Sequence, residues 1–273
     1  MSSSRLRLAI FDLAGTVVDY GCFAPTTAFT KLFSNAKIQV SPLQIRQFMG
    51  LHKREHLNRL LALPSVQQQW FQEYKSYPGF AVETRLYQQF IPLQLEALDT
   101  ESTVITGTDK AFAFTRSQGI VIGSTTGYTK VMSDKVRSKL LTQGISFDLM
   151  VSSDEVKRGR PHSDMILKQS ELLDLRCPKE IVKIGDTPDD ILEGKSVGCW
   201  TVGVLVSSNG MGLREHEFRD LSLSEKNLLL KREGGRLKEA DFLIRTVADL
   251  PQVITQINRY LQNGMSPRGL TGL

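Results

Sequence analysis

The sequence predicts an α/β fold, with a parallel sheet covered by helices on both faces and a small inserted helical domain. Short apolar runs alternate with helical patterns over most of the chain, which is typical of a parallel sheet. One stretch, from about residue 21 to 98, interrupts this alternation and has a mainly helical pattern. We therefore expect a Rossmann-like core from residues 1–20 and 99–262, a cap domain from residues 21–98, and a disordered tail from residues 263–273.

Six short apolar runs are the expected strands. The first, residues 6–11, ends at Asp12 and is followed by Gly15, as in a buried strand that leads into a turn. The others are residues 119–123, 147–151, 181–185, 200–206 and, more weakly, 241–244. Helical patterns lie between them at residues 109–118, 130–141, 163–173 and 188–197. Ligands bind at the carboxyl ends of the strands in such sheets, so Asp12, Thr126 and Asp186 predict where the site lies.

Helix signals also mark the inserted stretch. Residues 41–44 form a capping box, with Ser41 as the N-cap and Pro42 at the first helical position. We expect this helix to end at Gly50 and the next to run from residue 51 to 63, where Pro64 stops it. A third amphipathic pattern covers residues 82–98.

Composition and charge narrow the possible partners. The formal net charge is +5, but the basic residues are scattered, so we expect no nucleic-acid partner and a field that suits a small anionic substrate. No apolar run approaches the roughly 20 residues needed to span a membrane. The N-terminus lacks the features of a signal peptide, and three cysteines without a CxxC spacing fit a reducing compartment. We therefore expect a cytoplasmic protein with no membrane partner.

Four polar elements follow the expected strands. Asp12 can be a nucleophile or a metal ligand, or it can cap a turn. Asp186 and Asp190 stand four residues apart at a helix start, where carboxylates bind magnesium or cap the helix. Residues 124–128 offer hydroxyl and amide groups suited to phosphoryl oxygens, and Arg160 offers a cation that can neutralise them. In this order the four elements resemble the motifs of the haloacid dehalogenase superfamily.

One position departs from the phosphatase pattern of that superfamily. Phosphatases usually carry a second Asp two residues after the nucleophile, which protonates the leaving oxygen, and here this position is Ala14. Lys53 suggests a different chemistry, because it falls between Leu57 and Leu60 on an apolar helix face, with His56 beside it. Desolvation there would lower the pKa of the amine and let it form a Schiff base. The alternative is a lysine whose ammonium reaches solvent at the rim of the apolar face.

The chain resembles the phosphonoacetaldehyde hydrolase family more closely than the superfamily at large. The matching segments extend over about residues 6–261, and within this family an alanine at the position of Ala14 is normal. They are residues 12–16, 19–25, 49–56, 123–129, 159–161 and 183–187.

The resemblance implies a hydrolase that cleaves a carbon–phosphorus bond. Lys53 would form an iminium that accepts the electrons of that bond, Asp12 would attack phosphorus and become an aspartyl phosphate, and His56 would move protons near the imine. Mg²⁺ would be held by Asp12, the Ala14 carbonyl and Asp186, with Asp190 and Thr187 beside them. The resemblance also implies these substrate-binding residues: Thr126, Gly127, Tyr128, Arg160, Cys22 and Met49.

Two other functions remain open from the sequence. One is a magnesium-dependent phosphatase or phosphomutase acting on a small phosphate ester, and the other is a non-catalytic protein on the same fold. The resemblance further implies a homodimer through the cap. An apolar patch for that contact could come from Trp70, Phe71, Phe80 or Phe90, although core packing explains these residues equally well.

Overall fold

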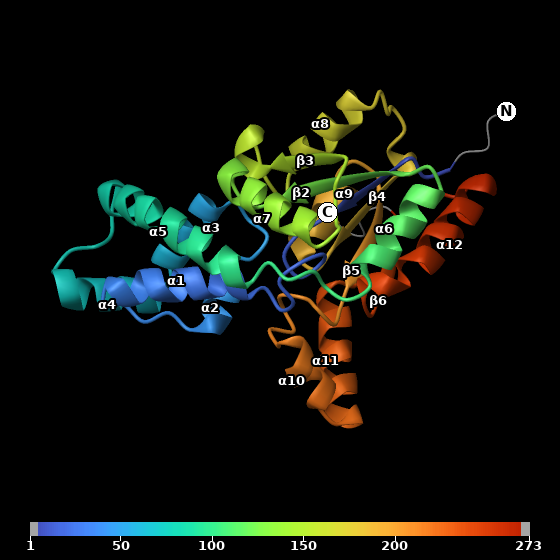
Figure 1. Cartoon of the computed structure of the whole chain (residues 1–273). Helices are drawn as coiled ribbons and strands as arrows, with labels where there is room; N and C mark the ends of the chain where they lie inside the picture. The colour runs from blue at the N-terminus through green and yellow to red at the C-terminus, as the bar shows by residue number, and fades with distance from the viewer. Residues whose placement is uncertain (1–4, 269–273) are drawn as a thin grey trace.

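The computed structural model of the chain describes residues 5–268, so residues 1–4 and the last five residues of the expected tail lie outside it. One sheet holds six parallel strands in the order β3-β2-β1-β4-β5-β6, and the expected α/β fold is confirmed (Figure 1). The strands are β1 (Leu8–Phe11), β2 (Val121–Thr126), β3 (Leu149–Ser152), β4 (Ile181–Gly185), β5 (Trp200–Val204) and β6 (Phe242–Ile244).

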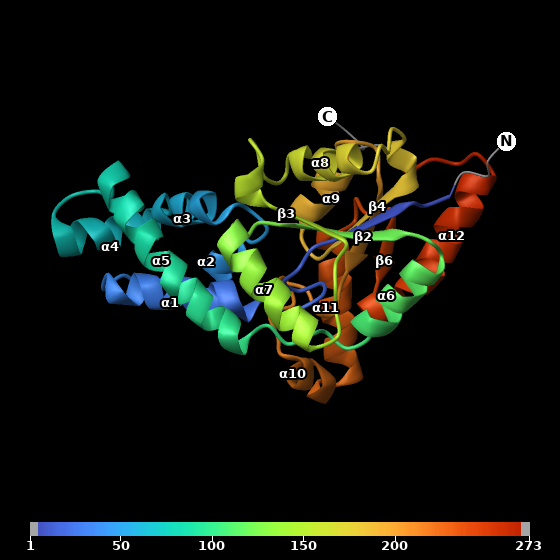
Figure 2. The ribbon, with the colours of Figure 1, turned by 45° about the horizontal axis from the view of Figure 1, so that its top comes forward.

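Side-chain alternation in β1 explains why helices cover both faces of the sheet. Ala9 and Phe11 pack into the larger apolar cluster, which α6 (Thr108–Ser117), α7 (Lys130–Thr142) and α12 (Leu250–Gln262) complete. Leu8 and Ile10 point to the opposite face and pack with α8 (Asp164–Leu172). Helix α9 (Pro188–Lys195) lies against β4 and β5, and Figure 2 shows α8 and α9 together, away from α6 and α12. A strand buried on both faces reads as a continuous apolar run, as the sequence does here.

Six helices lie between β1 and β2; the first five form the body beside the sheet in Figure 1, and we call residues 21–100 the insertion. Its interior is aromatic, with the rings of Phe29 and Phe90 stacked at 4.2 Å and Trp70 buried in the same apolar cluster. The five helices are α1 (Phe23–Asn35), α2 (Pro42–Arg46), α3 (Lys53–Leu61), α4 (Pro64–Tyr74) and α5 (Phe80–Thr100).

The predicted capping box is present at the start of α2. Ser41 N donates to Gln44 Oε1 at 2.9 Å, and Gln44 N donates to Ser41 Oγ at 3.3 Å. The helix ends at Arg46 rather than at Gly50, and the next begins at residue 53 rather than 51. Gly50 has a φ of 97°, which breaks the helical path, and His52 Nδ1 caps α3 by accepting from Arg54 N at 3.1 Å.

Two linkers join the insertion to the core, and they run side by side. Asp19 N donates to Thr103 O at 3.2 Å, and Ile105 N donates to Val17 O at 2.8 Å. The backbone of Asp19 and Cys22 is left-handed, with φ near 55° at both residues. The Asp19 carboxylate then caps α1 by accepting from two of its first N–H groups. The chain therefore enters and leaves the insertion at one hinge next to the carboxyl end of β1.

The sequence predicted no helix after β5, so α12 was missed as well as α10 (Glu215–Asp220) and α11 (Leu223–Arg236), which project from the core in Figure 1. In the insertion, α1 and α4 were missed. Three short 3-10 segments complete the described chain, at Ser153–Glu155, Pro178–Glu180 and Val247–Asp249. Within residues 5–268, no helix combines the length and apolar character that crossing a membrane requires. Part of the expected tail is described, and Arg268 N there donates to Asp241 Oδ1 at 2.8 Å.

Candidate active site

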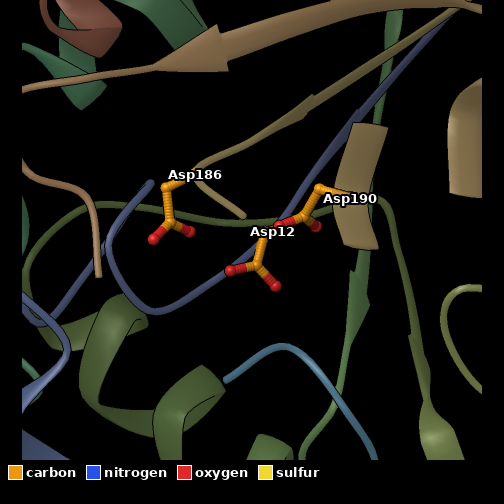
Figure 3. A group of neighbouring side chains, drawn as sticks. All are labelled: Asp12, Asp186 and Asp190. Atoms are coloured by element: carbon orange, nitrogen blue, oxygen red, sulfur yellow. The ribbon is translucent and has the colours of Figure 1, made fainter. Parts of the chain in front are cut away.

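Three carboxylates meet at the carboxyl ends of β1 and β4. Asp12 follows β1 directly, Asp186 follows β4, and Asp190 lies in the first turn of α9. One carboxylate oxygen of each lies within 4.8 Å of the others, and all three side chains are buried (Figure 3). This cluster is the arrangement that the two Asp motifs predicted, because parallel strands end at the same edge of the sheet.

Asp12 and Asp186 carry charge that is only partly balanced. Burial raises the pKa of Asp186 well above its ordinary value, and the negative charges of Asp12 and Asp190 raise it further. Asp186 accepts hydrogen bonds from Asn209 N at 2.7 Å and from Thr16 Oγ1 at 3.3 Å. Burial likewise raises the pKa of Asp12. Two converging, buried carboxylates of this kind fit a divalent cation, which would favour their ionised forms.

Asp190, in contrast, is already paired with cations. Its Oδ1 lies 2.8 Å from Lys183 Nζ and 2.8 Å from an Arg160 nitrogen, and Thr187 Oγ1 donates to its Oδ2 at 2.6 Å. Burial opposes ionisation of Asp190, but the charges of Arg160 and Lys183 outweigh it and lower its pKa. Asp190 therefore holds the side chains of Lys183 and Arg160 in place. Asp12 and Asp186 remain the better metal ligands.

Arg160 reaches into the site from the loop after β3 and contacts the expected nucleophile. One guanidinium nitrogen lies 2.5 Å from Asp12 Oδ1 and also donates to Thr125 O. Nε lies 3.1 Å from Glu193 Oε2, and the side chain is fully enclosed. A guanidinium that is fixed on three sides by carboxylates keeps its charge at the place where a phosphoryl group would meet Asp12.

The loop after β2 forms the opposite wall. Thr126 Oγ1 accepts from Tyr128 N at 3.1 Å, which shapes the turn around Gly127. A Cβ on Gly127 would lie 2.5 Å from Leu51 O and 2.6 Å from Gly50 O. Only glycine therefore allows the core loop to approach the insertion this closely.

Lys53 enters the same site from the insertion. It is the first residue of α3, is only 3% exposed, and places Nζ 5.1 Å from the centroid of the Tyr128 ring. Burial lowers its pKa from 10.5 to about 8, although the charge of Asp12 opposes this shift. The alternative of a lysine reaching solvent is excluded by this burial.

A cavity of about 20 Å³ brings the two halves of the site together. This volume admits about one water molecule, so the insertion lies closed over the core and a larger substrate requires it to move. The cavity is lined by Asp12, Ala14, Pro25, Met49, Gly50, Lys53, Thr126, Gly127, Tyr128, Arg160 and Thr187.

Two of the residues expected at the site lie just behind this lining. His56 is fully buried, its Nε2 lies 2.8 Å from Ile45 O, and its ring packs against Phe29 at 4.3 Å. Burial and the nearby charge of Lys53 lower the pKa of His56 well below its ordinary value. Cys22 Sγ lies 3.7 Å from Asp186 Oδ2, beside the carboxylates rather than at the cavity. Their roles in substrate and proton handling stay predictions.

Sequence reasoning missed several residues that hold the site together. Glu193 and Lys183 are fully buried and complete the charge network around Arg160 and Asp190. Glu193 could have been found from its place one helical turn after Asp190, which predicts that both side chains point to the same side. Asn209 lies in a loop without any motif, so no sequence signal marked it.

Comparisons with known proteins identify the family of the chain. A model of the haloacid dehalogenase-like hydrolase family matches residues 6–198. The chain is 36% identical over 257 residues to a phosphonoacetaldehyde hydrolase of Bacillus cytotoxicus, which covers 93% of this chain and 97% of the relative. It is 37% identical over 270 residues to one of Pseudomonas fluorescens, with 97% of both chains covered.

A solved structure agrees as well. It is described as a phosphonoacetaldehyde hydrolase-like protein from Oleispira antarctica, and it matches with a TM-score of 0.94 at 34% identity over 97% of each chain. The family match covers more than half of the chain, and the two relatives cover nearly all of it. The chain therefore belongs to the haloacid dehalogenase-like hydrolases and, within them, to the phosphonoacetaldehyde hydrolase family.

Proposed function

We propose that this protein hydrolyses phosphonoacetaldehyde to acetaldehyde and phosphate. The observation that carries the proposal is Lys53, a buried amine with a pKa of about 8 that lines the same cavity as Asp12. Direct displacement at a carbon–phosphorus bond would expel a carbanion, which is a very poor leaving group. An imine on Lys53 provides an acceptor for those electrons, so the two residues together make the cleavage feasible.

The first half of the reaction uses Lys53 and Asp12. The Lys53 amine attacks the aldehyde carbon, and loss of water leaves a protonated imine. The Asp12 carboxylate then attacks phosphorus, the carbon–phosphorus bond breaks, and its electron pair passes into the imine to give an enamine. Arg160, Thr126 and Gly127 would hold the phosphonate oxygens during this transfer, since all three line the cavity.

The second half regenerates both residues. Water attacks the aspartyl phosphate and releases phosphate from Asp12. The enamine carbon takes a proton, and hydrolysis of the resulting imine releases acetaldehyde and frees Lys53. His56 is the proposed carrier of protons near the imine, through Nδ1, because its Nε2 is held by Ile45 O. Met49, Tyr128 and Cys22 would shape the surroundings of the amine, whose pKa is lowered by burial.

We infer that the cation of this site is Mg²⁺. Asp12, Asp186 and the Ala14 carbonyl would hold it, with Asp190 and Thr187 beside them. When bound, the ion would offset the negative charge of the phosphonate. The hard oxygen donors and the raised pKa values of Asp12 and Asp186 support this choice.

The runner-up activity, a phosphatase or phosphomutase on a phosphate ester, fits the cavity less well. Ala14 lines the cavity and has no proton to give to a leaving oxygen. Lys53 would have no task in ester hydrolysis, yet its burial as a cation is costly. A residue kept at that cost is better explained by imine chemistry.

The test measures phosphate and acetaldehyde release from phosphonoacetaldehyde, with and without Mg²⁺. Both products should form in equal amounts, and borohydride should inactivate the enzyme only when the substrate is present. Lys53→Arg serves as the control, because arginine stays charged and forms no imine. Turnover without borohydride sensitivity, or hydrolysis of phosphate esters at a higher rate, would refute the proposal.

We also propose a cytoplasmic homodimer with no nucleic-acid or membrane partner. Of the four aromatic residues considered for the dimer contact, Trp70 and Phe90 are buried in the insertion, whereas Phe71 and Phe80 are exposed. Exposed aromatic side chains on the insertion support a contact there. Light scattering after gel filtration would test it: Phe80→Ser should shift a dimer toward monomer, and a wild-type mass of one chain would refute it.

A further inference from the structure

We propose that Arg46 and Asn209 form a latch that holds the insertion closed over the core and so positions Lys53 beside Asp12. This inference rests on the proposed function, since it concerns the closed state in which that reaction would occur. Arg46 belongs to the insertion and Asn209 to the core loop after β5. Both are positioning residues, because neither lines the cavity.

The hydrogen bonds between the two residues run in both directions. Asn209 Nδ2 donates to Arg46 O at 2.9 Å. The Arg46 guanidinium donates to Asn209 O at 3.1 Å and to Asn209 Oδ1 at 3.3 Å, and it also donates to Gly21 O in the hinge. Arg46 therefore binds the core loop and the hinge with one side chain, and the charge on its guanidinium strengthens each contact.

The position of Arg46 links these contacts to Lys53. Arg46 is the last residue of α2, and the loop that follows carries Met49 and Gly50 into the cavity before α3 begins at Lys53. The Arg46 carbonyl lies at the C-terminal end of α2, where it accepts from Met49 N at 3.3 Å and from Asn209 Nδ2 at 2.9 Å. When this helix end is fixed, the start of the loop of residues 47–52 is fixed as well, and this loop positions Lys53.

Asn209 connects the same latch to the carboxylates. It is buried, and its own N–H donates to Asp186 Oδ2 at 2.7 Å. Ser207, two residues earlier, fixes the same loop to the end of the first linker. Its Oγ donates to Gly15 O at 2.6 Å, and its carbonyl accepts from Gly21 N at 2.9 Å. One core loop thus sets the position of Asp186 and receives the insertion.

Cation–π contacts to Phe23 add to the latch near the hinge. Two guanidinium groups contact the Phe23 ring, with Arg46 Cζ 5.1 Å and Arg214 Cζ 4.3 Å from its centroid. Arg214 in turn pairs with Glu101 at 2.9 Å, beside the second linker. The closed arrangement is therefore held by side chains from the core, the insertion and the second linker, and by the Gly21 carbonyl in the hinge.

The closed cavity makes such a latch necessary for turnover. A space of about 20 Å³ cannot admit the substrate, so the insertion opens and closes in each cycle. The imine forms on the insertion, whereas the attacking carboxylate belongs to the core. Transfer of the phosphoryl group to Asp12 therefore depends on closure more strongly than imine formation does.

Two variants test the latch, each removing one side of it. Arg46→Met keeps the aliphatic stem and removes the guanidinium, and Asn209→Ala removes the amide while leaving the N–H that binds Asp186. Each should lower kcat/KM by about tenfold, as expected for loss of hydrogen bonds to a charged group. The double variant should lose little more than either single variant, because both remove the same contacts.

Amide hydrogen exchange separates opening from general damage. Exchange should rise in residues 47–53 and stay at wild-type rates inside α5. Arg59→Met is the matched control, because Arg59 pairs with Glu55 within the insertion, and it should keep wild-type kcat/KM and exchange. Borohydride with substrate should still inactivate both latch variants, which shows that Lys53 continues to form the imine.

Two results would overturn the latch: wild-type kcat/KM in both variants, or exchange raised equally over the whole chain. Failure of the proposed function would look different. In that case borohydride would leave the wild-type enzyme active in the presence of phosphonoacetaldehyde, whatever the exchange rates of the variants.

Discussion

Replacing Lys53 by methionine should abolish turnover and make the protein more stable. Lys53 is 3% exposed and lies over the Tyr128 ring, so folding removes its ammonium from water. Methionine has a similar unbranched length and needs no hydration, so it can fill the same space without the cost of a buried charge. The variant therefore separates what this residue does for catalysis from what it does for folding.

The size of the effect follows from the pKa. The pKa of Lys53 falls from 10.5 to about 8 on folding, because burial disfavours the charged form. Each pKa unit corresponds to about 1.4 kcal/mol, so the folded protein is destabilised by about 3 kcal/mol wherever both states are protonated. This penalty is complete below pH 8, shrinks as the pH rises from 8 to 10.5, and is absent above that range, where the amine is neutral in both states.

Urea unfolding at several pH values provides the assay. At pH 7, Lys53→Met should raise the free energy of unfolding by about 3 kcal/mol, and the gain should shrink toward pH 10. Lys31→Met, at an exposed ion pair with Glu96, is the control and should change stability by less than about 0.5 kcal/mol. A variant that is no more stable than wild type at pH 7, or a gain that does not depend on pH, would show that the amine is not desolvated.

Asp12→Asn should reduce phosphate release by at least about a thousandfold while Lys53 still forms the imine, and the measurement is borohydride trapping beside a phosphate assay; normal phosphate release would exclude Asp12 as the nucleophile. Glu193→Gln should lower kcat about 10- to 100-fold, because Arg160 loses a charged partner at 3.1 Å, and unchanged kcat would contradict that role. Chelation of divalent cations should stop phosphate release and leave imine trapping intact; trapping that also fails would place the metal in the first step.

The strands could be predicted because each buried strand appears in the sequence as an uninterrupted run of apolar residues. In β1 and β4 both faces of the sheet are covered, so every side chain is buried and the run ends where the sheet ends. The carboxylates followed from the same logic, since Asp12 and Asp186 stand just beyond such runs and Asp190 lies one helical turn after Asp186. Their convergence within 4.8 Å needed only the rule that parallel strands end at one edge.

Two of the helices that were missed, α4 and α11, could not be recognised from local signals alone. Pro64 was interpreted as the end of a helix, but it is also the first residue of α4, a position where proline is equally favoured. Helix α11 contains Gly234 and Gly235, which disfavour a helix locally. It is held instead by the buried Glu233, which accepts from Ser208 Oγ at 3.3 Å and pairs with Arg236.

The supporting residues of the site were hidden for a similar reason. Lys183 lies within an apolar strand, and nothing in the alternation of that strand shows that its amine meets Asp190 at 2.8 Å. Asn209 and Arg46 are far apart in sequence and belong to no motif. Their contact exists only because the insertion folds back onto the loop after β5.

The central place of β1 in the sheet has a consequence for how the enzyme is made. Leu8 of β1 pairs with Val121 of β2 on one side and with Ile181 of β4 on the other, and both partners come much later in the sequence. During synthesis, therefore, the strand that leads to Asp12 has no partner until residues 121–126 have left the ribosome, and its other edge stays open until residues 181–185 follow, whereas the helices of the insertion can form earlier from local contacts. A chain truncated before β4 would contain the complete insertion but would lack Asp186 and Asp190, and therefore the carboxylate cluster of the active site.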